Sequence, residues 1–278
     1  MADITAEMVR ELRDATNVSM MECKRALVEA NGDKDKAIRL LRERGVAIAA
    51  KKAGRATNQG LIGAAILPDG KVGALVEVNC ETDFVAKNET FHAFVKGIAE
   101  TAAGTDGNVA ELLKDRLLAK ITEIGENIVV RRNIRYVLQG QGLIATYVHL
   151  GGKIGVLLEL GCEKSESVQS PVFKELARDL TLHVAASSPR YLDRTAVPAD
   201  VIASEREIGA KQVQGKPANI IDKIVDGKMN KFYQQVCLVE QGFVKDPDTP
   251  VTKLLESKAK ELSDKLVLRR FTRYQLGE

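Results

Sequence analysis

Hydrophobic and polar positions in the first 45 residues follow the period of three short helices. Apolar side chains recur on one face of each segment, and a polar residue precedes each segment: Thr5, Ser19 and Asp33. Ser19 and Glu22 have the spacing of a capping box, which satisfies free backbone N–H groups at the start of a helix. The third helix is predicted to end at Gly45, so that residues 46–59, rich in Ala, Lys and Gly, connect two domains.

The pattern then changes to the two-residue period of β-strands, and it occurs twice. Residues 60–103 and 142–185 align without a gap at an offset of 82, and twelve of the 44 aligned pairs are identical. Unrelated segments would share roughly three. Each copy predicts a strand, a turn, a second strand and a helix. In the second strands the alternating apolar positions are Val72, Ala74, Val76, Val78 and Cys80 in copy one, and Ile154, Val156, Leu158, Leu160 and Cys162 in copy two.

The duplication extends to one more strand in each copy. Residues 129–138 and 267–276 share Arg-Arg, Arg-Tyr and Leu at matching spacing, and we interpret each as the strand that closes its unit. Copy one reaches this strand after a short helical insert, whereas the insert of copy two is much longer. The long insert predicts a helical hairpin with its turn at residues 215–217, and then a strand around residues 236–239. Packing on its own domain and self-association explain the apolar stripe of the hairpin equally well.

The composition favours a soluble protein without a dedicated nucleic-acid surface. The chain has 41 basic and 38 acidic residues, and this net charge of +3 is far from the basic excess of such surfaces. No apolar run is long enough to span a membrane, and the N-terminus lacks a secretion signal, so we expect a cytoplasmic protein. The four cysteines are widely spaced, which is untypical of a zinc site or a disulfide framework.

Conventional catalytic motifs are absent from the sequence. It contains no phosphate-binding loop and no dinucleotide-binding glycine motif, and it predicts no cofactor, metal site or covalent chemistry. We interpret His92, His149 and His183 as surface or satisfied core residues. The cluster of Arg131, Arg132 and Arg135 is able to contact phosphate, but its recurrence in the second closing strand favours a solvated or salt-bridged sheet face.

The match between the two copies fails at Thr82–Asn88, between a core strand and the next helix, and the residues Thr82–Val85 stand out in this segment. From spacing alone, the favoured interpretation is that Phe84 packs back into its own core and Asp83 caps the following turn. The alternative is an aromatic anchor that protrudes beside a carboxylate toward a partner. Met20 and Met21 pose the same choice, and core packing is favoured for one of the two.

With these residues the chain resembles the elongation factor Ts family, whose members are the nucleotide exchange factors for elongation factor Tu. The resemblance covers essentially the full length and rests on four motifs, at residues 20–27, 77–87, 124–127 and 183–186. It implies an α+β fold in which a three-helix bundle like a ubiquitin-associated (UBA) domain precedes a duplicated α+β core with an inserted helical hairpin. The domains implied are residues 1–55 for the UBA-like bundle and linker, 56–140 for core subdomain N, and 141–278 for core subdomain C, with the hairpin at about 188–234.

The resemblance also implies a function. Family members bind elongation factor Tu in its GDP form and promote release of GDP without covalent chemistry. Asp83 and Phe84 would form an exchange wedge, with Phe84 between helices of the partner's GTPase domain and Asp83 near its Mg²⁺ and phosphate site. The other partner-binding residues implied are Thr82, Val85, Leu12, Met20, Met21, Ile124, Gly125 and His149.

Further expectations concern assembly and the alternative function. The resemblance implies a homodimer formed through the hairpin, and neither a membrane nor a nucleic acid is an expected partner. Some family members continue with a helix beyond the closing strand, whereas this sequence ends at Gly277-Glu278, which changes the expected C-terminal part of the interface. A non-catalytic RNA- or ribosome-associated binding protein is the alternative, and a steep dependence of affinity on salt would distinguish it.

Overall fold

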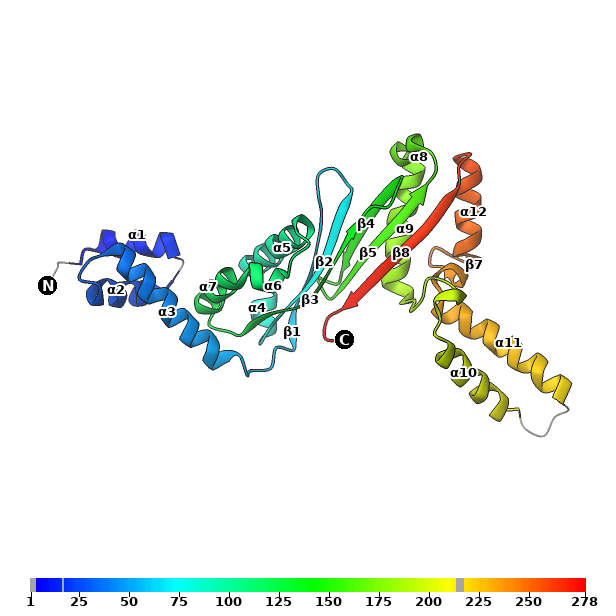
Figure 1. The fold of residues 1–278 in the computed structure, drawn as a ribbon, viewed down its shortest axis with the longest axis horizontal. Coiled ribbons are helices and arrows are strands. Elements are labelled where there is room, and N and C mark those ends of the chain that lie inside the picture. The colour runs from blue at the N-terminus through cyan, green and yellow to red at the C-terminus, as the bar shows by residue number, and fades with distance from the viewer. Residues whose placement is uncertain (1–3, 17, 214–217) are drawn as a thin grey trace.

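The computed structural model describes residues 4–16, 18–213 and 218–278 as an elongated α+β molecule. The N-terminal helices lie at one end, and α10 (Ala199–Lys211) and α11 (Ala218–Val236) project from the other (Figure 1). Two small sheets lie side by side between these ends. The predicted mixture of helices and strands is confirmed. Within these ranges, no helix has the length and apolar character needed to cross a bilayer.

Three helices form the N-terminal bundle: α1 (Ala6–Thr16), α2 (Met20–Glu29) and α3 (Lys34–Lys52). The predicted caps are confirmed. The side-chain oxygens of Thr5, Ser19 and Asp33 accept hydrogen bonds from backbone N–H groups three residues later, at 3.3, 3.3 and 3.0 Å. These bonds satisfy donors that have no partner within the helix. The apolar faces meet in a core formed by Val9, Leu12, Val18, Cys23, Ala26, Leu27, Ala30, Ala37 and Leu41.

The predicted end of the third helix at Gly45 is wrong. Helix α3 continues to Lys52, because the residues after Gly45 are mostly Ala and Lys, which are strong helix formers. Gly45 serves packing instead. A Cβ atom at this position would lie 3.0 Å from Thr122 Oγ1, so glycine lets α3 approach α7 (Lys114–Ile124) closely. The predicted linker therefore shrinks to the few residues between Lys52 and the first strand.

The predicted repeat is confirmed as two antiparallel three-stranded sheets with the same topology. The first has the order β1 (Gln59–Ile66), β2 (Val72–Cys80), β3 (Ile128–Val137), and the second has the order β4 (Gly142–His149), β5 (Ile154–Cys162), β8 (Leu266–Gln275). Gly60 pairs with Asn79 just as Gly142 pairs with Gly161. Each central strand also has a register shift at the same point, after Glu77 and after Glu159.

Helices cover the outer face of each sheet (Figure 1). Helix α5 (Glu89–Gly104) packs on the first sheet and α9 (Pro171–Ser187) on the second, each through a hydrophobic core. Shorter elements complete the two halves: α4 (Asp83–Ala86), α6 (Val109–Leu112), α8 (Ser165–Gln169), α12 (Val251–Glu261), β6 (Gly242–Phe243) and β7 (Asp246–Pro250).

The inner faces of the two sheets pack against each other. A Cβ on Gly73 would lie 2.7 Å from Ile144 Cγ2, and a Cβ on Gly155 would lie 2.4 Å from Ile62 Cγ2. These four residues are two identical pairs of the repeat, so each copy presents the same surface to the other. The contact is completed by a core of Ile62, Leu75, Tyr136, Ile144, Leu157 and Tyr274.

Two carboxylates are fully buried at this contact. Glu77 accepts from Arg131 Nη1 at 3.0 Å and from Arg132 Nε at 2.7 Å. The backbone N–H of Gly277, from the other half, donates to the same carboxylate at 3.1 Å. Burial alone raises the pKa of Glu77, but these hydrogen bonds and one from Asn79 outweigh it and hold the pKa below its usual value. The carboxylate is therefore charged at neutral pH.

Glu159 occupies the equivalent place in the second sheet. It accepts from Arg269 Nη1 at 3.2 Å, from Arg270 Nε at 2.7 Å and from the backbone N–H of Gln139 in the first half at 2.7 Å. The salt-bridged interpretation of the arginine cluster is thus confirmed, because Arg131 and Arg132 pair with Glu77 and Arg135 pairs with Asp106.

The arginines also cross between the halves. The Arg132 guanidinium lies 4.2 Å from the ring centroid of Tyr274, and that of Arg270 lies 4.0 Å from the ring centroid of Tyr136. Each arginine therefore links a buried carboxylate of its own sheet to an aromatic ring of the other.

In the long insert of copy two, the structure contains two helices but not the strand expected after them. Helices α10 and α11 pack together, with Val225 and Met229 buried and an Arg206–Asp226 ion pair at 3.0 Å. The predicted turn at residues 215–217 lies outside the described residues. The strand predicted around residues 236–239 is wrong. Val236 ends α11, and a short 3-10 helix follows at Leu238–Glu240, because these backbone groups bond locally or to residues 190–192.

Replacing either buried carboxylate should destabilise the fold. Glu77→Ala and Glu159→Ala each leave two arginines and a backbone N–H of the other half without their acceptor. We expect each to lower the free energy of unfolding by about 3 kcal/mol, measured by urea denaturation. Glu100→Ala, on the exposed face of α5, is the control and should change it by less than about 0.5 kcal/mol. Equal stability of all three variants would contradict this view of the contact.

Candidate functional site

Phe84 projects into solvent from the turn at Thr82–Val85. Its relative exposure is 82%, the largest among the exposed large hydrophobic residues of the structure. Its neighbours anchor the turn, because Ala86 is buried and Val85 packs against the core of the first sheet. The interpretation favoured from spacing, that Phe84 packs back into its own core, is therefore wrong. An apolar ring held in water by a rigid framework is typical of an interaction site.

Asp83 lies beside this ring but does not cap the turn. The cap is Thr82, whose Oγ1 accepts from the backbone N–H of Val85 at 3.4 Å. Asp83 instead pairs with Lys87, which donates at 2.6 Å. This hydrogen bond holds the pKa of the Asp83 carboxyl below its usual value, so the group is charged at neutral pH. The turn therefore presents an apolar ring next to a negative charge.

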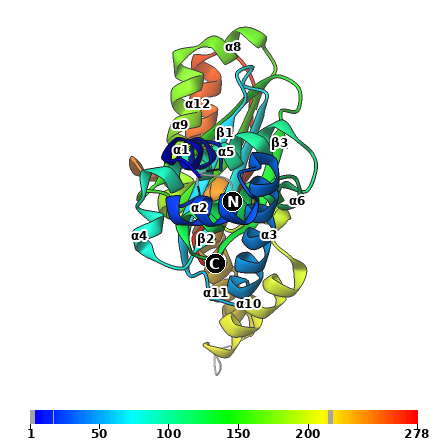
Figure 2. The ribbon, with the colours of Figure 1, turned by 90° about the vertical axis from the view of Figure 1, so that its left-hand side faces the viewer.

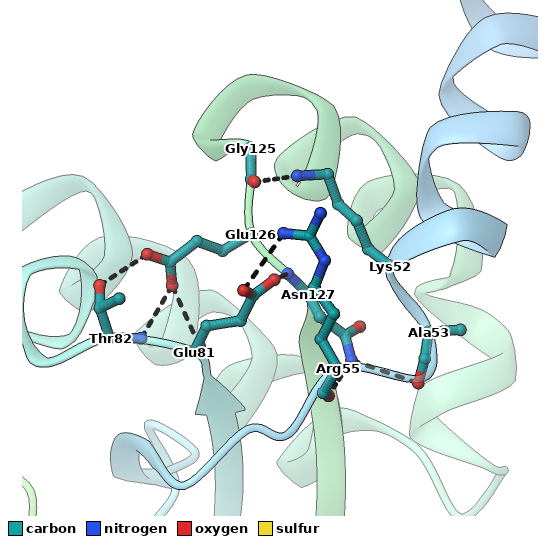
Figure 3. A network of polar contacts seen from close by, with 8 residues as sticks. All are labelled: Lys52, Ala53, Arg55, Glu81, Thr82, Gly125, Glu126 and Asn127. Carbon is teal, nitrogen blue, oxygen red and sulfur yellow. Dashed lines mark hydrogen bonds and ion pairs between the residues drawn. The ribbon is translucent and has the colours of Figure 1, made fainter.

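The Glu126 carboxylate holds the base of the turn (Figure 3). Its Oε2 accepts from the backbone N–H groups of Glu81 and Thr82, each at 3.0 Å, and its Oε1 accepts from Thr82 Oγ1 at 2.6 Å. One side chain thus satisfies three donors at the point where β2 ends and α4 begins. Hydrogen bonds to a charged acceptor are stronger than those between neutral groups.

The same network reaches the N-terminal bundle (Figure 3). Glu81 accepts from the backbone N–H of Asn127 at 2.6 Å, and the Asn127 side chain donates to the backbone oxygen of Arg55 at 3.1 Å. Lys52 at the end of α3 donates to the backbone oxygen of Gly125. The hydrogen bond from Asn127 holds the pKa of Glu81 below its usual value. The turn, the loop before β3 and the end of α3 are therefore one connected unit.

The N-terminal candidates divide into exposed and buried residues. Met20 and Met21 are 41% and 62% exposed, so the prediction that one of them fills the core is wrong. Both follow the Ser19 cap in the first turn of α2, which places them on the surface of the bundle. Leu12, in contrast, is fully buried in the bundle core and presents no side chain to a partner. Its expected role as a direct contact is therefore not supported.

The remaining candidates lie in both sheet units. Ile124 is half-buried against the first core, and Gly125 is exposed with a left-handed backbone (φ 82°) at the end of α7. His149 is exposed at the end of β4, where Tyr147 Oη lies 2.8 Å from its Nδ1. Figure 2, in which the N-terminal end faces the viewer, shows α4 to the side of the bundle. Within the described residues, the polar network joins Gly125 to the turn but does not include Met20, Met21 or His149.

Sequence reasoning missed the role of Glu126. It placed the residue in a recognisable motif and assigned contacts only to its neighbours Ile124 and Gly125. A signal was available, because Glu126 precedes β3 by the same distance as Asp264 precedes β8. An acidic residue at the same position before both closing strands indicates that the two residues have the same structural role.

The environment of Cys80, at the end of β2, does not favour a reactive thiol. Burial, together with the nearby Glu126, raises the pKa of the Cys80 thiol to about 11, so it is protonated and a poor nucleophile at neutral pH. Across the ranges described, no group of three or more His, Cys, Asp or Glu side chains could hold a metal ion. An exposed aromatic ring beside a carboxylate, held on a double-sheet platform, is typical of a protein that binds a partner.

The comparisons with known proteins agree with this class. The family model described as "Elongation factor TS" matches residues 81–278. Proteins named elongation factor Ts from Trichlorobacter lovleyi, Clostridium perfringens and a Nitratiruptor strain are 42%, 43% and 44% identical. In each case 99% of this chain aligns with 93% of the relative. The chain belongs to the elongation factor Ts family, and it is a translation elongation factor.

Because Phe84 makes little use of its own core, its removal should not affect folding. We expect Phe84→Ala to change the free energy of unfolding by less than about 0.5 kcal/mol. Phe91→Ala is the matched comparison, since Phe91 is fully buried in the same half, and it should lower stability by about 3–5 kcal/mol. Urea denaturation measures both. A large loss in Phe84→Ala would mean that the ring supports the fold.

His183 should make stability fall in mildly acidic solution. It is fully buried, accepts at Nδ1 from the Val244 N–H at 3.1 Å, and lies 3.0 Å from Gln241 Oε1 through Nε2. Burial lowers its pKa, although the bond to Gln241 acts in the opposite direction. The unfolded chain binds the proton below about pH 6.5, so this stability is present above pH 6.5 and lost as the pH falls through the folded pKa. Denaturation of wild type and His183→Gln between pH 7.5 and 5.5 measures it, and the slope should be smaller in the variant.

Proposed function

We propose that this chain is a guanine nucleotide exchange factor that binds elongation factor Tu in its GDP form and promotes release of GDP. The observation that carries the proposal is the exposure of Phe84 on a turn that Glu126 holds in place. An aromatic ring that becomes buried when a partner binds is a typical hot spot of a protein interface. The proposed action is by binding alone, and it takes place in the cytoplasm, where translation occurs.

The proposed mechanism uses the two side chains of the turn differently. Phe84 inserts between helices of the partner's GTPase domain, where desolvation of its ring supplies binding energy. Asp83 approaches the site that holds Mg²⁺ and the phosphates of GDP. Mg²⁺ demands nearly ideal octahedral geometry, so a small displacement of its surroundings weakens the nucleotide. By linkage, GDP and the exchange factor then weaken each other's binding to the same extent.

The other candidate contacts extend this interface. Met20, Met21, Gly125 and His149 are exposed, and Thr82, Val85 and Ile124 are partly exposed. Met20 and Met21 would contact the GTPase domain from a bundle that we propose to be UBA-like, and flexible thioethers suit such a surface. His149 would contact the partner from the second sheet.

The hairpin of α10 and α11 is proposed as a dimerisation module. Ile208 on α10 is 45% exposed, so part of the apolar surface of the hairpin is available to a second copy. The alternative, a protein that binds RNA or the ribosome, gains no support from the arginines of the closing strands. Arg131, Arg132, Arg269 and Arg270 are occupied by Glu77 and Glu159.

Removing the Phe84 ring should impair exchange strongly. We expect Phe84→Ala to reduce the catalytic efficiency of GDP release from elongation factor Tu by about 30- to 1,000-fold, which corresponds to about 2–4 kcal/mol of lost interaction energy. The measurement is the release of fluorescent GDP at increasing concentrations of the factor. Val244→Ala is the control, because Val244 is also exposed but lies in the second half.

Two results would contradict the proposal. If the wild-type protein leaves the rate of GDP release unchanged at stoichiometric concentration, the proposed activity is wrong. If the Phe84 and Val244 variants behave alike, the activity does not depend on the exposed ring.

A further inference from the structure

Helix α4 is too short to fix its own orientation. It has only four residues, and isolated helical turns are unstable in water because nucleation fixes several dihedral angles for one hydrogen bond. Helix α4, which contains Asp83, Phe84 and Val85 of the turn, therefore needs an external support. The structure supplies this support from the loop between α7 and β3, through the three hydrogen bonds that Glu126 accepts.

The second half contains the same arrangement, in which an acidic side chain holds the end of a strand, but the residues of the turn that follows are different. Asp264 accepts from the backbone N–H groups of Glu163 and Lys164 at 3.2 and 3.1 Å. Its third donor is the Ser167 hydroxyl at 2.6 Å, in place of a threonine. Asp264 thus holds the end of β5 as Glu126 holds the end of β2. The residues at the second turn include no exposed large hydrophobic side chain, so the repeat provides an internal control.

The Glu126 carboxylate also has a fixed base. The residue before it accepts from Lys52 through its backbone oxygen, and the residue after it bonds to the segment that follows α3. The backbone N–H of Asn127 donates to Glu81 at 2.6 Å, next to the two N–H groups that Glu126 binds. The loop and the end of β2 are therefore cross-linked in both directions, and the Glu126 side chain cannot move without breaking this arrangement.

We propose that Glu126 is a positioning residue for exchange: it preorganises the Thr82–Val85 turn so that Phe84 and Asp83 enter the partner in a single orientation. The proposal rests on the proposed function. Its physical basis is that ordering a loop during binding consumes interaction energy, whereas a turn that is already ordered does not. Misplacement of a binding group by about 1 Å can lower a rate on the order of 100-fold.

The number and direction of the hydrogen bonds give the proposal a specific signature. In Glu126→Gln the amide oxygen can still accept from the two N–H groups, and the amide NH₂ can donate to the Thr82 hydroxyl oxygen. This variant should retain the turn and exchange within about threefold of wild type. Glu126→Ala removes both acceptor oxygens, and with them all three hydrogen bonds, and should lower the efficiency of GDP release by about 10- to 100-fold.

The Asp264→Ala variant separates positioning from general stability. It removes the equivalent acceptors from the other half, so its effect on thermal unfolding should match that of Glu126→Ala. Its rate of GDP release should stay at the wild-type value at a temperature where all variants are folded. If Asp264→Ala slows exchange as much as Glu126→Ala does, the effect is one of general stability and the inference is overturned.

A double-mutant cycle with Phe84→Ala tests the link to the wedge directly. If Glu126 acts by positioning Phe84, adding Glu126→Ala to Phe84→Ala should change exchange by no more than about threefold. Fully additive effects would overturn the inference. If Glu126→Ala does not fold, Glu126→Asp takes its place, because the shorter side chain cannot reach all three donors. If a folded Glu126→Ala or Glu126→Asp protein exchanges at the wild-type rate while Phe84→Ala is impaired, the positioning role is wrong and the proposed function is unaffected.

Discussion

The contact between the two sheets is the constraint on which the rest of the structure depends. Each inner face is buried by the other, and each contains a fully buried glutamate whose charge two arginines of its own closing strand neutralise. A buried charge is tolerated only when it is paired and hydrogen-bonded. One donor to each carboxylate comes from the other half, the backbone N–H of Gly277 for Glu77 and that of Gln139 for Glu159. Neither half therefore satisfies its own buried carboxylate alone. The platform therefore behaves as one body.

The rigidity of this platform matters at the end of β2. The strand is buried along its whole length, and the turn that follows is fixed by Glu126 within a network that also includes the end of α3. An exposed aromatic ring on a flexible loop would lose much of its binding energy to ordering. On this rigid base the exposed ring of Phe84 keeps its direction, and the charge of Asp83 keeps its place beside it. The network thus relates the position of the N-terminal bundle to that of the turn.

Sequence patterns predicted the parts of the fold that repeat. The alternation of Val72 to Cys80, the shared Arg-Arg and Arg-Tyr spacing and the three helix caps all correspond to observed elements. Patterns failed where tertiary contacts decide the outcome. Gly45 reads as a helix end but serves close packing on Thr122. Residues 236–239 read as a strand, but they end α11 and begin a 3-10 helix, and their backbone groups bond to residues 190–192. At the site, spacing pointed Phe84 inward, because no local rule shows that Val85 and Ala86 already fill the available core. The resemblance to a family gave the opposite orientation, which the geometry supports.

The contact between the two sheets also explains where the sequences of the two repeat copies differ. Some identical residues of the two copies, such as Gly73 and Gly155 or Ile62 and Ile144, face each other across the sheets, where a change in one copy would clash with the other. The ends of β2 and β5 lie outside this contact and need only an acidic residue, Glu126 or Asp264, to hold the backbone. The Phe84 side chain of the turn is then unconstrained by packing, whereas Val85 still packs against the core. One copy can therefore present Asp83 and Phe84 while the other presents polar residues, without any change to the platform that supports both.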